Sequence, residues 1–217
     1  MIRIHGTVAD FNGNPISGAS VELKKNAFKG AHGCLSDDQG RYELSAEEGR
    51  YVALAAIVPK DYRRTRLEYW AWNVPAHRDL EINPRYDALE IYAMNAWIPQ
   101  GALPSLQIYF RPMSLKRALD QGGLEELRKM RVVDIAPDLT PEDIQVRIGE
   151  APVPALEVNK VREAGPGGQA IFAYLIQTPL PEKRPAHDIW RITLTAKDPE
   201  TGEMGENLLF WERPQYV

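Results

Sequence analysis

The chain has 217 residues, a hydrophobic share of 44%, a charged share of 26% and a formal net charge of −4. These values fit a globular protein with a real core, either one large domain or two of about 100 residues each. No basic stripe is present of the kind that nucleic acid or an anionic membrane requires, which argues against both as partners.

The single cysteine, Cys34, excludes an intrachain disulfide, so packing must stabilise the fold. No basic segment followed by an apolar one is visible at the N-terminus, so no signal peptide is predicted. The compartment stays open: cytoplasmic for a full-length chain, extracytoplasmic if a leader has been removed. The longest apolar run, Tyr51 to Val58, is far shorter than the roughly 20 residues that span a bilayer.

Apolar and polar residues alternate over much of the chain, which predicts β-strands with one buried face. Clusters of glycine, proline and asparagine separate these runs, and Asp198 to Gly202 is typical of a hairpin loop. The predicted strands are residues 2–8, 21–24, 41–44, 51–58, 64–72, 89–94, 106–110, 144–148, 156–161, 171–176, 189–196 and 207–211.

One segment departs from this alternation. Between Ser114 and Met130 the apolar residues recur at spacings of three and four, which predicts a helical excursion at about 114–130. Ser114 is a suitable N-cap, and Gly122 and Gly123 divide the segment into two short helices.

A stretch rich in proline and glycine, Pro99 to Pro104, separates two sets of strands and predicts a domain boundary there, with residue 113 as an alternative. We therefore predict an all-β fold of two tandem β-sandwiches, residues 1–103 and residues 104–217, with the helical excursion in the second.

Four segments of the first module carry a family pattern: Gly6 to Asp10, Gly13 to Val21, Ser36 to Leu44 and Gly49 to Leu54. They resemble the carboxypeptidase regulatory-like, or transthyretin-like, domain. The resemblance implies a seven-stranded sandwich that acts as a spacer, a folding support or a binding module. It implies no particular activity, because fold alone does not define function.

The second half is similar to an immunoglobulin-like sandwich. The strand from Asp143 to Ile148 and the closing hairpin at Asp198 to Gly202 fit that plan. The Cys…Trp…Cys arrangement of antibody domains is missing, so the similarity is to bacterial relatives that lack disulfides.

The predicted strand from Arg64 to Trp72 is the most informative segment for function. Alternation places Arg66, Glu68, Trp70 and Trp72 on one face, and a core face rarely carries such charges. The two indoles are therefore predicted to lie on a face that begins solvated. If the strand starting at Leu89 is a neighbour, Tyr92 and Met94 extend the same patch.

Exposed aromatic side chains beside polar groups are typical of a ligand or partner surface, and flat rings are what sugars stack on. Because large apolar surfaces are uncommon on monomers, the first expectation is that the second module or the segment 114–130 covers the rings. An open ligand face is the second expectation, and a β-bulge that buries the rings is the third.

Other chemistry has less support. His32 and Cys34 share a strand face, but zinc needs three or four protein ligands, and nothing brings His5 and His77 to them. The sequence from Asp10 to Asn14 mimics the start of a calcium loop but lacks its glycine and glutamate, so we predict a turn. No hydrolase, zinc-protease or phosphate-binding motif is present, and no metal or cofactor is predicted.

The sequence thus predicts a non-catalytic binding or structural module. The leading hypothesis is recognition of carbohydrate through Trp70, Trp72 and Tyr92, with Arg66 and Glu68 as polar neighbours. The alternative is a scaffold or assembly protein in which the same patch is an interface between domains or subunits. An enzyme with a catalytic cluster assembled from distant residues is the third hypothesis.

Overall fold

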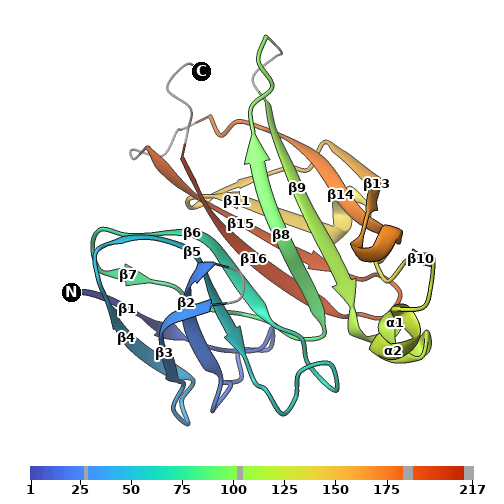
Figure 1. The fold of residues 1–217 in the computed structure, drawn as a ribbon. Coiled ribbons are helices and arrows are strands. Elements are labelled where there is room, and N and C mark those ends of the chain that lie inside the picture. Colours follow the sequence, from blue (N-terminus) through green and yellow to red (C-terminus); the bar gives the residue numbers. More distant parts are fainter. Residues whose placement is uncertain (27–28, 102–104, 183–187, 213–217) are drawn as a thin grey trace.

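The computed structural model describes residues 1–26, 29–101, 105–182 and 188–212. Most of this part of the chain consists of strands, which form three sheets (Figure 1). The small sheet has the order β4-β1-β7, with β1 at Ile2–Thr7, β4 at Arg41–Ala46 and β7 at Leu80–Glu81.

The central sheet has the order β12-β11-β15-β16-β6-β5-β2-β3. Its strands are β2 (Ser20–Asn26), β3 (Lys29–Leu35), β5 (Gly49–Ile57), β6 (Tyr69–Ala76), β11 (Ile144–Ile148), β12 (Ala151–Val153), β15 (Ile189–Lys197) and β16 (Met204–Glu212). The third sheet contains β8 (Leu89–Trp97), β9 (Ser105–Ser114), β10 (Val132–Val133), β13 (Glu157–Ala164) and β14 (Ala170–Pro179).

The first sandwich forms where the small sheet packs on the β6-β5-β2 half of the central sheet. Strand β4 shows why: its side chains are alternately exposed and buried, and Tyr42 and Leu44 enter the core with Ile4 and Leu54. The all-β sandwich predicted for the first module is confirmed.

The second sandwich forms where the third sheet packs on the β11-β15-β16 half of the central sheet. Ile108 and Phe110 of β9 face Ile192 and Leu194 of β15 across this core. Trp190 belongs to the same core, as its alternation with Ile192 indicates. The third sheet and the small sheet lie on opposite faces of the central sheet.

Strand β16 joins the two sandwiches, because it pairs in parallel with β6 and continues the sheet from one to the other. Its alternate side chains serve different cores. Leu208 and Phe210 belong to the first core, whereas Leu209 and Trp211 belong to the second. The two sandwiches predicted from the sequence are therefore tandem along the chain but share one sheet.

The predicted helical excursion is confirmed as α1 (Leu115–Asp120) and α2 (Gly123–Leu127). Ser114 caps α1, since its Oγ accepts a hydrogen bond from the Arg117 N–H at 3.1 Å. Short 3-10 turns follow at Pro141–Asp143 and Pro166–Gly168. No helix of the described ranges is long and apolar enough to cross a membrane.

The boundary predicted between residues 103 and 104 lies outside the described residues. The strands on either side of it, β8 and β9, pair with each other, and both contribute to the second core. Along the chain, the change from first-core to second-core residues falls between Tyr86 and Leu89. The division into separate domains at residue 103 stays a prediction.

Candidate functional site

Each half of the central sheet is covered by another sheet on one face, which leaves two uncovered half-faces. Beside the second sandwich, the uncovered half-face is polar and carries Gln145, Arg147 and Arg191, as a solvated sheet face should. Beside the first sandwich, the uncovered half-face carries Trp70 and Trp72 of β6. Because it carries aromatic rather than only polar residues, the uncovered half-face beside the first sandwich is the candidate site.

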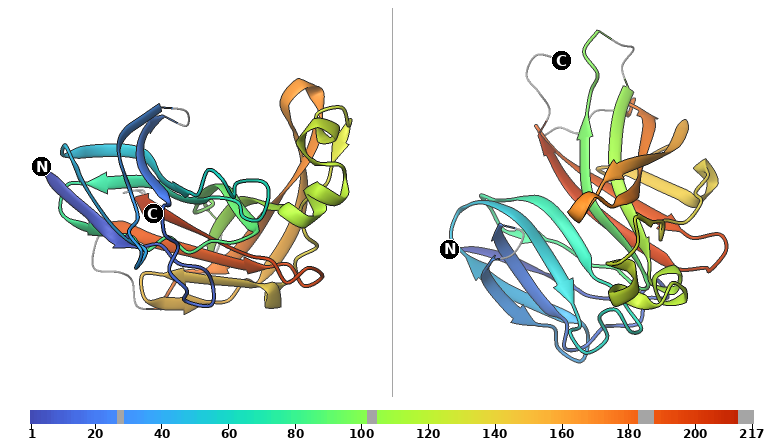
Figure 2. Two further views of the ribbon diagram at one scale, coloured as in Figure 1. Left: turned by 90° about the horizontal axis from the view of Figure 1, so that it is seen from below. Right: turned by 45° about the vertical axis from the view of Figure 1, so that its right-hand side comes forward.

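The register of the sheet explains why these indoles lie at the edge of the second core, against which Trp72 packs. Trp72 lies opposite Leu209 of β16, and Leu209 is buried in the second core. The indoles therefore lie on the same face of the central sheet as Leu209. They lie just beyond β8, the edge strand of the third sheet. In Figure 2 (left), the β2–β3 hairpin in blue and the β13–β14 hairpin in orange rise on opposite sides of this region.

Trp70, Trp72 and Tyr92, here called the aromatic trio, contact one another directly. The two indoles are stacked, with ring centroids 5.0 Å apart and an interplanar angle of 7°. Tyr92 meets both edge-on, at 5.3 Å from Trp70 and 5.4 Å from Trp72. Small residues lie opposite the indoles on β5, Ala55 beside Trp70 and Ala53 beside Trp72, which leaves room for the rings. Trp70 is buried, whereas Trp72 and Tyr92 are half-exposed.

Backbone strain is concentrated around the trio. In the described ranges, the non-glycine residues with positive φ are Arg63 (61°), Asn73 (57°) and Ala93 (53°). Asn73 follows Trp72, and Ala93 follows Tyr92. Such conformations cost about 1–3 kcal/mol each, and they cluster at functional sites.

Two of the strained residues mark breaks in the strand alternation. After Asn73, Val74 returns to the first core, although the register with β5 continues unbroken. Ala93 lies at a register shift between β8 and β9, a β-bulge, after which Met94 enters the second core. The expectation that Met94 extends the aromatic patch is therefore wrong, because the bulge turns its side chain inward. The trio ends at these two breaks.

Two carboxyl groups lie beside the trio. The Trp70 indole N–H donates to Glu90 Oε1 at 3.1 Å, and the Tyr62 hydroxyl donates to Glu68 Oε1 at 3.3 Å. Burial raises the pKa of Glu90 well above its usual range, and the nearby charge of Glu68 adds to the increase. Burial likewise raises the pKa of Glu68, although its hydrogen bond from Tyr62 acts in the opposite direction.

Cationic side chains border the trio at both ends. Lys24 Nζ lies 5.9 Å from the Trp70 ring centroid, and the Arg111 guanidinium lies 6.0 Å from that of Tyr92. Arg111 is held in place by an ion pair with Glu163, with Nη2 and Oε2 2.7 Å apart. The site thus combines aromatic rings with cationic side chains and carboxyl groups that can form hydrogen bonds, which suits a polar ligand that carries flat apolar faces.

The structure brings four of the five predicted site residues together: Glu68, Trp70, Trp72 and Tyr92. Arg66 lies apart, with ion-pair distances of 3.7 Å to Asp61 and 3.9 Å to Asp87. The prediction of one continuous strand from Arg64 is wrong, since β6 begins at Tyr69. The segment before it is a turn, in which the Asp61 carbonyl accepts from successive backbone N–H groups.

The sequence prediction missed other members of the site: Tyr62, Glu90, Lys24 and Arg111. Lys24 and Arg111 come from β2 and β9, and only the sheet order brings them near the trio. Glu90 was visible two residues before Tyr92 on the same strand face, and this spacing could have identified it.

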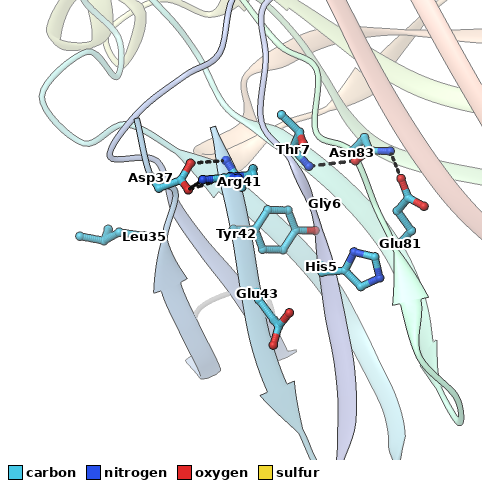
Figure 3. Close-up of a pocket in the computed structure, with 10 residues that line it drawn as sticks. All are labelled: His5, Gly6, Thr7, Leu35, Asp37, Arg41, Tyr42, Glu43, Glu81 and Asn83. Atoms are coloured by element: carbon cyan, nitrogen blue, oxygen red, sulfur yellow. Dashed lines mark hydrogen bonds and ion pairs between the residues drawn. The ribbon is translucent and has the colours of Figure 1, made fainter. Parts of the chain in front are cut away.

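A shallow pocket of about 450 Å³ on the outer face of the small sheet is a weaker candidate (Figure 3). Several of its polar groups are already hydrogen-bonded to protein groups. The Thr7 N–H donates to Asn83 Oδ1 at 2.8 Å, and Arg41 Nε donates to Asp37 Oδ2 at 2.9 Å. The Tyr42 hydroxyl is directed to the Ile82 carbonyl at 2.7 Å. Few unpaired groups remain there to recognise a ligand.

The metal hypotheses gain no support from the geometry. Within the described ranges, no three or more His, Cys, Asp or Glu side chains converge as metal ligands. The segment from Asp10 forms the predicted turn: Asp10 Oδ1 accepts from the N–H groups of Asn12 and Asn14 at 2.8 and 2.9 Å.

No family model and no curated protein matches the chain. Solved structures with overall similarity include a DUF3823 family protein from Bacteroides ovatus, with 11% identity, 97% of this chain and 99% of that chain covered, and a TM-score of 0.32. A candidate carbohydrate binding protein from Bacteroides uniformis has 9% identity, coverage of 97% and 98%, and a TM-score of 0.32. BcpA, the major pilin subunit of Bacillus cereus, has 13% identity, coverage of 96% and 67%, and a TM-score of 0.28.

Similarity at this level is too distant to carry residue roles to this chain. The transthyretin-like and immunoglobulin-like assignments of the two modules stay predictions, and the function rests on the residues of the site itself.

Proposed function

We propose that the protein is a non-catalytic binding module that recognises carbohydrate on the aromatic trio. The observation that carries this proposal is the partly exposed pair of Trp72 and Tyr92, packed against the buried Trp70 at the edge of the third sheet. Sugar rings have apolar faces that pack on aromatic rings, and their hydroxyl groups need the hydrogen-bonding side chains that border this site.

A glycan array tests the proposal with the wild-type protein and the W72A variant. We expect W72A to bind at least about tenfold more weakly, which corresponds to about 1.4 kcal/mol. The matched control is W97A, because Trp97 lies on β8 outside the trio and is 42% exposed. W97A should bind like the wild type. Blank arrays for the wild-type protein, or equal binding by W72A and wild type, would contradict the proposal.

The second candidate function is assembly, in which this surface packs against another protein. Trp97 favours it, since an exposed indole on the same strand as Tyr92 adds apolar surface beyond the trio. Light scattering discriminates between the two functions. A stable oligomer that W97A converts to a monomer would support assembly, whereas a monomer at all concentrations would leave self-assembly without support.

A further inference from the structure

The two short helices cover a cavity of about 150 Å³ that shares Glu90 with the surroundings of the aromatic trio. Its walls are mostly aliphatic and come from α1, α2 and the strand ends beneath them, including Leu115, Ala118, Leu127 and Ile135. A cavity of about this size in an apolar core stays dry and accepts a molecule as large as benzene. The space is therefore too small for a peptide or a sugar chain.

Glu90 is the distinctive group in this wall. The residue is only 3% exposed, and in the described part of the chain its carboxyl group accepts one hydrogen bond, from the Trp70 indole. Arg63 also lines the cavity, with its guanidinium 4.7 Å from the Tyr62 ring centroid. The hydroxyl groups of the wall are already engaged. The Tyr62 hydroxyl donates to Glu68, and Ser114 Oγ bonds to Arg117 N–H and to Glu203. Glu90 thus offers buried hydrogen-bonding capacity inside a mostly apolar space.

A neutral ligand suits this environment better than a charged one. An ion would have to lose its hydration shell to enter an aliphatic cavity, at a cost of several kcal/mol. Burial also raises the pKa of Glu90, which favours the neutral carboxyl, a group that can both donate and accept.

We propose that this cavity is a second ligand site, which binds a small neutral molecule with one apolar ring or branched chain and one hydroxyl group directed at Glu90. Leu119 and Leu124, at the rim of the cavity, are 50% and 37% exposed. An apolar ligand would therefore also shield these two side chains from water. The proposal does not depend on carbohydrate binding, because the cavity and the exposed rings of the trio are separate surfaces that meet at Glu90.

Calorimetric titration of the full chain with phenol and with toluene tests the proposal. The two probes have the same number of non-hydrogen atoms, and only phenol carries a hydroxyl group. We expect phenol to bind about fivefold more tightly than toluene, since one hydrogen bond contributes about 1 kcal/mol. Failure of both probes to bind the wild-type protein would overturn the proposal.

Two variants locate the site. A118M fills the cavity from α1 and should weaken phenol binding at least tenfold, while K116M, on the exposed side of the same helix, should leave it unchanged. E90L should remove the preference for phenol and retain toluene binding, with thermal melts to confirm folding. Unchanged phenol binding in A118M would place the ligand elsewhere, and a retained preference in E90L would remove Glu90 from the proposal.

Discussion

The carboxyl groups of Glu68 and Glu90 are buried near each other beside the trio, and this arrangement links protonation to stability. The pKa of each is raised above the value of 4.5 expected for an unfolded chain. The folded state therefore keeps protons that the unfolded state releases. It follows that the contribution of the pair to the free energy of unfolding is fully present below about pH 4.5 and is lost as the pH rises toward the folded pKa.

The E90Q variant should reduce this dependence. Its amide keeps the shape of the side chain but cannot ionise, so the variant should lose less stability than the wild type between about pH 5 and about pH 8. Thermal melts across this range measure the effect. E47Q serves as the control, because Glu47 is exposed. Parallel pH profiles for wild type and E90Q would show that the carboxyl is not held protonated.

Asp198 illustrates the opposite case of a carboxylate held in its charged form. Its side chain is fully buried, and Oδ2 lies 3.0 Å from Arg117 Nε. Although burial opposes ionisation, the Arg117 guanidinium and the N–H groups of Glu200 and Thr201 lower the pKa of Asp198. This stabilisation is present above about pH 4, and it is lost as the pH falls through the folded pKa.

The D198N variant should therefore be less stable at neutral pH by about 2 kcal/mol, because it breaks a buried ion pair and leaves Arg117 without its main partner. Urea unfolding measures the loss. The control is E200Q. Glu200 also forms an ion pair with Arg117 but is 73% exposed, so its loss should lower the free energy of unfolding by less than about 0.5 kcal/mol. Equal losses in the two variants would mean that burial does not strengthen the pair.

At the scale of elements, the strained breaks at Asn73 and Ala93 border the site, and their strain can be measured. Ala93 has a φ of 53°, which glycine adopts without penalty. A93G should stabilise the protein by about 1 kcal/mol, whereas A55G, in an ordinary strand conformation opposite Trp70, should destabilise it by a similar amount. Chemical unfolding of both variants provides the comparison. A loss of stability in A93G would show that β8 is not strained there.

The elements also show which parts of the fold and site were predictable. Alternation correctly identified strands such as β4, and the spacing of three and four residues with the Ser114 cap identified the helices. The pattern failed at Arg64 to Arg66, because alternating charges also occur in a turn held by backbone hydrogen bonds. The breaks in alternation at Asn73 and Ala93 could not be read from composition, since neither position is a glycine.

Sheet order explains why only part of the site was visible. Trp70 and Trp72 are two residues apart, so the sequence predicts that they share a face. Lys24 and Arg111 reach the trio only because β2 and β9 lie on either side of it through long-range strand pairing. Such pairing depends on contacts between distant segments, which a local pattern does not encode.

For the whole molecule, the shared strand β16 predicts how the two sandwiches unfold. Two independent tandem domains would melt separately. Here β16 places Leu208 in one core and Leu209 in the other, so loss of this strand opens both. The indole N–H of Trp211 and the amide of Asn207 also hold β8, through the carbonyls of Ala96 and Ile91 at 2.8 and 2.7 Å.

We therefore expect a single calorimetric transition in which the van 't Hoff and calorimetric enthalpies agree. L208A and L209A should each cost about 2–5 kcal/mol and should shift that one transition, although the two side chains lie in different cores. L119A is the control, because Leu119 is 50% exposed on α1, and it should shift the transition little. Two resolved transitions, with L208A moving only one and L209A only the other, would show that each sandwich folds independently and that β16 does not couple them.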